Sequence, residues 1–430
     1  MSKKEIVYVC SECGEEFSKW SGVCSSCQAW NTIREIRLDK NANLSKDIEE
    51  AKVLCLRDLP SAQFQRIKIN IREIDQVLGG GIVPGSVILL GGDPGIGKST
   101  ILAQVINNIS NSLYASGEES PEQLKIRIER LGLDLANFNV ISETDIDCVV
   151  KTIYKIKPKL AVIDSIQTMY SRDFPSTPGS LVQVRECALK LQNTAKKLHI
   201  PIILIGHVTK EGSIAGPKIL EHLVDVVLYL EGERFHNNRI LRGVKNRFGE
   251  ISEIGIFEMT ERGLKEVDNP SKLFLEEKSN NVSGNVVTAT LEGNRPILVE
   301  IQSLIHKSVF GYPRRTVSGF DLNRLNLLLA ILAKRAKIYL DKYDVFVNVV
   351  GGLKVKDPAC DLAVVLALAS AYYNKKIDSE LCAFGELGLT GEIRRVKLDK
   401  KRINEAKKLG FNKIVTEKFL DKAINNLFKK

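Results

Sequence analysis

A glycine-rich stretch at residues 92–100, GDPGIGKST, restricts the possible folds of this chain more than any other feature. It fits the phosphate-loop pattern G-x-x-x-x-G-K-[ST], in which backbone N–H groups and a lysine surround a polyphosphate. Residues 86–90 before it are apolar, as in a short buried strand, and residues 101–109 after it have apolar positions at helical spacing. This order predicts a nucleoside triphosphate site. The alternative, a glycine turn before an ordinary helix, is disfavoured by the lysine, the hydroxyl residue and both flanking elements.

The residues of this loop have expected roles at such a site. Gly95 and Gly97 would let the backbone approach the phosphates without a Cβ in the way. Lys98 would neutralise the β and γ phosphates, and Ser99 would ligate Mg²⁺. The expected nucleotide-binding residues are Gly92, Asp93, Pro94, Gly95, Ile96, Gly97, Lys98, Ser99 and Thr100.

Strand and helix patterns alternate after the loop, which predicts an α/β fold with a parallel sheet and crossover helices. The expected strands are residues 113–115, 139–142, 160–164 and 201–205, and the expected helices are residues 121–131, 145–156 and 181–198. Segments 226–230 and 239–245 follow as a predicted hairpin.

Carboxylates stand at two strand ends of this predicted sheet. Asp164 ends strand 160–164, which we expect beside the strand before the phosphate loop, where it can hold the hydration shell of Mg²⁺. Glu118 and Glu119 follow strand 113–115, at the edge that faces ligands in such folds. Glu118 is the preferred base to orient the attacking water. Alternatively, one or both glutamates cap the helix begun by Pro121.

Two irregular segments, residues 165–180 and 206–218, leave the same edge of the sheet. They are candidate mobile loops that contact a ligand or DNA, or else solvated connections. His207 could sense the γ-phosphate, or it could be a satisfied buried histidine. Lys245 and Arg247 could reach a neighbour's phosphates as an arginine finger does, or they could form a basic turn.

Four cysteines form two C-x-x-C pairs with ten residues between the pairs: Cys10, Cys13, Cys24 and Cys27. Two such knuckles complete a tetrahedral zinc site, and a segment this small needs the metal to fold. A redox dithiol is the alternative, which two pairs at this spacing disfavour. We expect a structural zinc ribbon without catalysis at residues 1–32, followed by a polar linker at residues 33–55.

The composition is that of a globular protein, with 44% hydrophobic and 27% charged residues. The net charge of +10 suits an anionic partner such as nucleic acid. No apolar run is long enough to span a bilayer, and no apolar signal segment follows Met1. We therefore expect a cytoplasmic protein, in which nine cysteines favour metal binding or buried thiols over disulfides.

Together these motifs resemble the bacterial RadA (Sms) family of DNA-repair proteins, which are RecA-like ATPases. The resemblance runs over essentially the full chain and includes the cysteine ribbon, the phosphate loop and residues 78–81, 116–120, 163–167, 206–212 and 244–249 (VKNRFG). It implies a RecA-like ATPase domain at residues 56–269 that uses ATP, Mg²⁺ and Zn²⁺. It also implies a DNA-dependent ATPase that assembles as a ring, most often a hexamer. Such a protein acts with RecA on single-stranded or branched DNA, driving branch migration or unwinding of recombination intermediates.

Residues 270–430 resemble the α+β proteolytic domain of Lon. A Lon-type peptidase needs a serine and a lysine, but Ala359 occupies the serine position and the lysine position falls near Lys400. An ATP-dependent peptidase is therefore the disfavoured alternative, and Cys360 is interpreted as a buried structural thiol. We interpret the domain as a surface for assembly and DNA contact, supported by Lys334, Arg335, Lys337 and Lys354.

Overall fold

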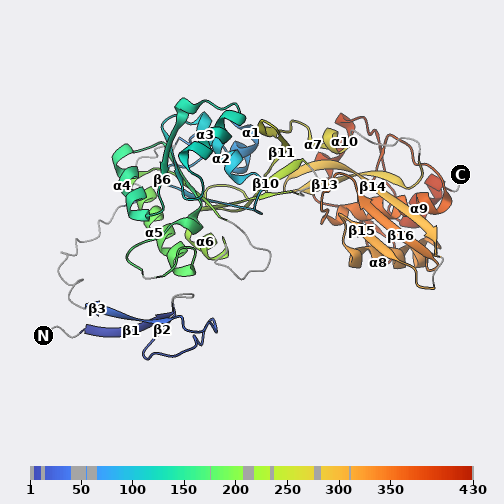
Figure 1. Ribbon diagram of the computed structural model, residues 1–430. Coiled ribbons are helices and arrows are strands. Elements are labelled where there is room, and N and C mark those ends of the chain that lie inside the picture. Colours follow the sequence, from blue (N-terminus) through green and yellow to red (C-terminus); the bar gives the residue numbers. More distant parts are fainter. Residues whose placement is uncertain are drawn as a thin grey trace. The chain divides into compact units, whose positions relative to one another are not determined.

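A computed structural model describes residues 4–10, 15–39, 55, 65–174, 176–206, 217–232, 237–275, 282–308 and 311–428 (Figure 1). The chain divides into two compact units. The first comprises Met1–Gly232 and Asn237–Glu266, and the second Glu233–His236 and Val267–Lys430. Within the described residues, no helix has both the length and the apolar character needed to cross a membrane.

A small antiparallel sheet of order β2-β1-β3 forms the N-terminal ribbon of the first unit. β1 (Lys4–Cys10) pairs briefly with β2 (Glu16–Phe17) and along its whole length with β3 (Ile33–Asp39). The predicted linker at residues 33–55 therefore begins too early. A strand in so narrow a sheet needs no broad apolar face, so the charged composition of β3 is compatible with pairing.

The rest of the first unit is built on a nine-stranded sheet of order β12-β11-β10-β9-β4-β8-β7-β5-β6. Its strands are β4 (Val87–Gly91), β5 (Ser112–Ser116), β6 (Phe138–Ser142), β7 (Leu160–Asp164), β8 (Ile202–Ile205), β9 (Val226–Glu231), β10 (Asn238–Asn246), β11 (Ile254–Thr260) and β12 (Gly263–Glu266). The strands from β9 to β6 are parallel, and β10, β11 and β12 extend the sheet antiparallel. The predicted parallel sheet and the hairpin of β9 and β10 are confirmed.

The position of β7 in this sheet differs from the prediction. β8 lies between β4 and β7, so the strand that ends in Asp164 is not beside the strand that leads into the phosphate loop. After β7 the chain crosses over through α5 (Leu181–Leu198) and returns as β8 into the intervening position. Sequence order alone does not determine which crossover fills that place.

Helices cover both faces of the core sheet (Figure 1). Short apolar strands alternate their side chains, so Ile88 and Leu90 of β4 face one core while Val87 and Leu89 face the other. The first core is shared with α1 (Arg72–Val77), α2 (Lys98–Asn108) and α3 (Pro121–Arg130). The second is shared with α4 (Ile146–Ile156), α5 and α6 (Pro217–Leu223). Strands buried on both faces explain the continuous apolar runs in the sequence.

The second unit contains a six-stranded mixed sheet of order β15-β16-β14-β13-β17-β20. Its strands are β13 (Asn285–Glu292), β14 (Arg295–Lys307), β15 (Arg315–Ser318), β16 (Tyr343–Val349), β17 (Leu381–Cys382) and β20 (Lys413–Ile414). The helices are α7 (Pro270–Leu275), α8 (Leu322–Ile331), α9 (Asp361–Tyr373), α10 (Asp399–Lys408) and α11 (Leu420–Phe428). α9 lies against β13 and β14 and is buried on nearly all sides, as expected of an almost wholly apolar helix.

Candidate nucleotide and zinc sites

The phosphate loop joins the buried strand β4 to α2, with Lys98 as the first residue of the helix. Lys98 is buried, and its Nζ donates to the carbonyl oxygens of Gly92 at 2.8 Å and Asp93 at 3.0 Å. Burial lowers the pKa of the Lys98 ammonium, while three nearby carboxylates oppose that shift, those of Asp164, Glu118 and Asp93. The lysine is therefore folded over its own loop, at the place where phosphate oxygens would compete for it.

The glycines of the loop serve two different purposes. A Cβ on Gly97 would lie 2.6 Å from Cε of Met259, so this glycine allows close packing within the protein. A Cβ on Gly95 would meet no protein atom within 4 Å, and its φ of +76° suits glycine. Of the two glycines predicted to admit phosphates, only Gly95 borders open space.

Asp164 ends β7 as a buried carboxylate. Its Oδ2 accepts a hydrogen bond from the hydroxyl of Tyr114 on β5. Its Oδ1 is buried and has no hydrogen-bond partner among the described residues. Such an orphaned oxygen is costly unless a ligand satisfies it, and a carboxylate oxygen suits Mg²⁺ or its bound water. The residues present thus fit a magnesium ion, with Ser99 in the first turn of α2 as a second oxygen ligand.

Glu118 is tied to the same strand end. Its Oε1 accepts a hydrogen bond of 2.5 Å from the hydroxyl of Ser165, the residue after Asp164. The N–H of Gly117 also donates to the Asp164 carbonyl at 2.7 Å. The backbone of residues 117–118 is therefore fixed to the end of β7, so that Glu118 and Asp164 lie at one site.

Glu119 lies elsewhere. Its Oε2 is 2.6 Å from Nη1 of Arg127 on α3. The start of α3 is capped by a reciprocal pair, Ser120 and Gln123, rather than by either glutamate. The alternative in which Glu118 or Glu119 caps this helix is thus replaced by the Ser120 capping box.

The Lys245–Gly249 segment, at the end of β10, contacts its own chain. Nζ of Lys245 donates to the carbonyls of Glu221 at 2.6 Å and Val224 at 2.8 Å, at the C-terminal end of α6. Burial, and next the charge of Arg247, lower the pKa of Lys245. Arg247 lies 3.4 Å from the buried carboxylate of Asp225, and its side chain is 53% exposed. Arg247 is therefore the more accessible of the two cations.

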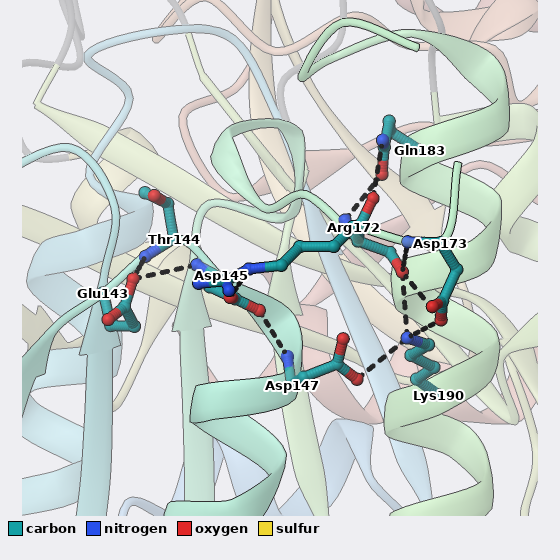
Figure 2. Close-up of polar contacts among 9 residues, drawn as sticks. Glu143, Thr144, Asp145, Asp147, Arg172, Asp173, Gln183 and Lys190 are labelled. Atoms are coloured by element: carbon teal, nitrogen blue, oxygen red, sulfur yellow. Dashed lines mark hydrogen bonds and ion pairs between the residues drawn. The ribbon is translucent and has the colours of Figure 1, made fainter. Parts of the chain in front are cut away.

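The loop after β7 is anchored by ion pairs over its first half (Figure 2). Arg172 reaches Oδ2 of the buried Asp145 at 2.6 Å. Lys190 of α5 bridges Asp147 at 2.8 Å and Asp173 at 2.6 Å. This part of the predicted loop is thus tied to α4 and α5. His207 and residues 207–216 lie outside the described residues.

Three of the four ribbon cysteines come together: the Sγ atoms of Cys10, Cys24 and Cys27 lie within 4.8 Å of one another. Cys10 and Cys27 are 3.7 Å apart at sulfur. Two thiolates at about 2.3 Å from one tetrahedral zinc ion would lie roughly 3.8 Å apart. Cys13 falls outside the described residues. The described donor set therefore fits zinc.

Three family models match successive parts of this chain. The model of the rubredoxin metal binding domain matches residues 8–35, that of the AAA domain residues 51–213, and that of subunit ChlI of Mg-chelatase residues 319–418. DNA repair protein RadA of Streptococcus pyogenes serotype M3 is 49% identical, covering 97% of this chain and 94% of that protein. DNA repair protein RadA of Bacillus subtilis (strain 168) is 48% identical over 425 residues, covering 96% of this chain and 93% of that protein. This chain belongs to the RadA family of DNA repair proteins.

The predicted resemblance to the RadA family is confirmed. So is the predicted architecture: an N-terminal zinc ribbon, a RecA-like ATP-binding core and a C-terminal ChlI/Lon-like domain. A crystal structure of the RadB recombinase aligns with a TM-score of 0.39 and 25% identity, covering 47% of this chain and 99% of that one.

In the C-terminal domain of this RadA-family chain, the serine position of Lon is a buried methyl group, Ala359. Lys400 is exposed on α10. Arg402 is instead the buried cation of this helix, with Nη2 2.7 Å from Oδ2 of Asp357. Cys360 is fully buried, and burial raises the pKa of its thiol to about 12. The predicted interpretation of Cys360 as a structural thiol agrees with this environment.

Three residues near the candidate nucleotide site were not predicted from the sequence: Tyr114, Arg127 and Arg239. Arg239 of β10 donates from Nε to the carbonyl of Ile96 in the phosphate loop at 3.1 Å. Its partner lies 143 positions away, so no local pattern could reveal it. For Tyr114 the available signal was a tyrosine inside a predicted sheet strand, because a buried phenolic hydroxyl usually has a hydrogen-bond partner.

Proposed function

We propose that this chain is a cytoplasmic, DNA-dependent ATPase that processes recombination intermediates in DNA repair. It would act with RecA recombinase on single-stranded or branched DNA and drive branch migration or unwinding. The observation that carries this proposal is the similarity to DNA repair proteins over nearly the whole chain. The net charge of +10 is compatible with a nucleic acid partner.

At the nucleotide site, four of the predicted residues have proposed roles. Lys98 would exchange the carbonyls of Gly92 and Asp93 for phosphate oxygens and neutralise charge on the γ-phosphate. Ser99 and Asp164 would hold Mg²⁺, which supplies positive charge to the β and γ phosphates when bound. Glu118 is positioned by Ser165 to orient the attacking water and take its proton.

A neighbouring subunit would complete this site in a ring, most often a hexamer in this family. Arg247 supports the proposal because its side chain is 53% exposed. Lys245 would have to leave the carbonyls at the end of α6 before it could act in the same way. Proteolysis is not part of the proposed function, since Ala359 has no nucleophilic atom and Lys400 is exposed.

ATP turnover by the pure protein, with and without single-stranded DNA, tests the proposal. We expect stimulation by DNA, and loss of at least about 10²-fold in rate in Lys98→Ala, because the γ-phosphate loses its main neutralising group. Lys151→Ala, an exposed change on α4, is the matched control. Imaging of the assembly and a branch-migration assay with RecA filaments would follow. Near-normal turnover in Lys98→Ala would refute the nucleotide site, and turnover indifferent to DNA would refute DNA dependence.

A further inference from the structure

We propose that Tyr114 and Arg127 are positioning residues for the Asp164 carboxylate, fixing Oδ1 as the oxygen presented to Mg²⁺. The inference rests on the role proposed above for Asp164. Neither residue would touch nucleotide or metal. They would act through Asp164, from a neighbouring strand and from α3.

The contacts form one continuous line across the first unit. The hydroxyl of Tyr114 donates to Oδ2 of Asp164. Nη2 of Arg127 donates to the same hydroxyl at 3.1 Å, and its Nη1 lies 2.6 Å from Oε2 of Glu119. Tyr114 is 1% exposed and Asp164 is 4% exposed, so water does not compete for these bonds.

The direction of the hydrogen bonds follows from the chemistry of the donors. A guanidinium has only donors, so the oxygen of Tyr114 must accept from Arg127. The one phenolic proton of Tyr114 is then directed at Asp164. Arg127 thereby sets the orientation of the hydroxyl, and the hydroxyl occupies Oδ2. The oxygen that remains is Oδ1, which is buried and has no partner among the residues that the structure describes.

Glu119 completes the arrangement by balancing a largely buried charge. The side chain of Arg127 is only 13% exposed, and an uncompensated buried cation is costly. Glu119 supplies the opposite charge, whereas Glu118 bonds to Ser165. The two adjacent glutamates therefore have different relations to the same site. Glu118 lies next to Asp164, whereas Glu119 is linked to Asp164 through Arg127 and Tyr114.

Two substitutions test the inference on the full-length protein. Tyr114→Phe keeps the ring and removes only the hydroxyl, and Arg127→Ala removes the donor that orients it. The matched controls are Tyr154→Phe, a tyrosine of α4 that is 36% exposed, and Arg130→Ala, an exposed arginine one turn along α3 from Arg127. Arg127→Lys is the second variant if Arg127→Ala does not fold.

The readouts are Mn²⁺ affinity in the presence of nucleotide, by electron paramagnetic resonance, and fluorescent ADP affinity in EDTA. We expect Mn²⁺ affinity to fall about tenfold in both test variants, the typical effect of one hydrogen bond to a charged group. Affinity for ADP in EDTA should stay within about twofold, because the phosphate loop is untouched. A residue that merely stabilises the fold would weaken both affinities together.

Mn²⁺ affinity equal to that of the controls in Tyr114→Phe and Arg127→Ala would overturn the inference, as would a parallel loss of metal-free ADP binding. Asp164→Asn separates this failure from failure of the proposed function. If Asp164→Asn weakens Mn²⁺ binding while the two test variants do not, only the positioning role is wrong. If Asp164→Asn leaves Mn²⁺ binding intact, the proposed metal role of Asp164 is wrong as well.

Discussion

Nη2 of Arg66 donates a hydrogen bond of 2.6 Å to the carbonyl of Phe248, although the two residues are 182 positions apart. Nη1 of the same side chain donates to the carbonyls of Leu78 at 2.9 Å and Gly81 at 3.3 Å. A single guanidinium therefore joins the glycine turn at residues 78–81 to the end of the VKNRFG segment. Both turns are motifs by which the sequence resembles its family, and Arg66 links them.

Removing this link should loosen the VKNRFG segment without unfolding the core. We expect Arg66→Ala to lower the free energy of unfolding by about 1–3 kcal/mol, the loss of charge-assisted hydrogen bonds to backbone carbonyls. Amide hydrogen exchange of residues 244–249 should accelerate, as followed by mass spectrometry. Lys68→Ala removes an exposed cation two residues away and is the control. Unchanged exchange in Arg66→Ala would show that the segment is held by other contacts.

The two cations of that segment should behave differently. Arg247→Ala should bind nucleotide and lose less thermal stability than Lys245→Ala, because the Arg247 side chain is half exposed. It should turn over ATP at least about 10³-fold more slowly if Arg247 acts as a finger. Lys245→Ala should also lower the melting temperature, because it bonds two carbonyls at the end of α6. Mixed assemblies of Lys98→Ala and Arg247→Ala chains should regain some turnover. If the two proteins co-assemble and no activity returns, the role across subunits is wrong.

Some features of this structure can be predicted from short sequence patterns, and others cannot. The phosphate loop and the elements beside it lie within 25 consecutive residues, so their order in the sequence is their order in space. Arg66, Arg127 and Arg239 act through partners on other elements, and their surroundings in sequence carry no sign of it. The place of β8 between β4 and β7 is likewise a property of the crossover, which strand patterns do not contain.

The C-terminal end of the zinc ribbon could not be predicted from composition. The predicted linker includes β3 because the residues of β3 are mostly charged, yet β3 pairs with the whole of β1. Polar composition identifies a linker only where no partner strand exists, and a metal-stabilised ribbon needs little apolar burial to keep its strands paired.

The ribbon should hold one zinc ion per chain. Elemental analysis of anaerobically purified protein should find it, and Cys10→Ser or Cys27→Ser should lose it. Cys55→Ser, an exposed cysteine beyond the ribbon, should retain it. Acid should release the metal, because protons compete for the thiolate ligands as the pH falls. A chain without metal under anaerobic conditions would rule out the zinc site.

The Cys360 thiol should not react with alkylating reagents in the folded protein. Burial raises the pKa of its thiol to about 12, so at pH 8 only about one molecule in 10⁴ carries a thiolate. Iodoacetamide should label the exposed Cys148 in the native state and Cys360 only after denaturation, as measured by mass spectrometry. Casein should remain intact with or without ATP. ATP-stimulated cleavage that survives exhaustive purification would contradict the expected lack of peptidase activity, and Cys360→Ala would then test whether Cys360 is the nucleophile.

β10 connects two arginines that, under the proposed arrangement, act at the nucleotide sites of different subunits. Near its start, Arg239 bonds to Ile96 in the phosphate loop of its own chain, and just beyond its end stands Arg247. Eight residues of extended chain span roughly 26 Å. β10 pairs with β11 over Asn238–Arg242 and with β9 over Ile240–Asn246, with a register shift between Gly243 and Lys245. A shift of the phosphate loop on nucleotide binding would move β10. This would reposition the Arg247 guanidinium, which acts on the adjacent subunit under the proposed arrangement. ATP binding at one site would then change the ATP affinity of the neighbouring site. We therefore expect a Hill coefficient above one for ATP and a lower Hill coefficient in Arg239→Ala.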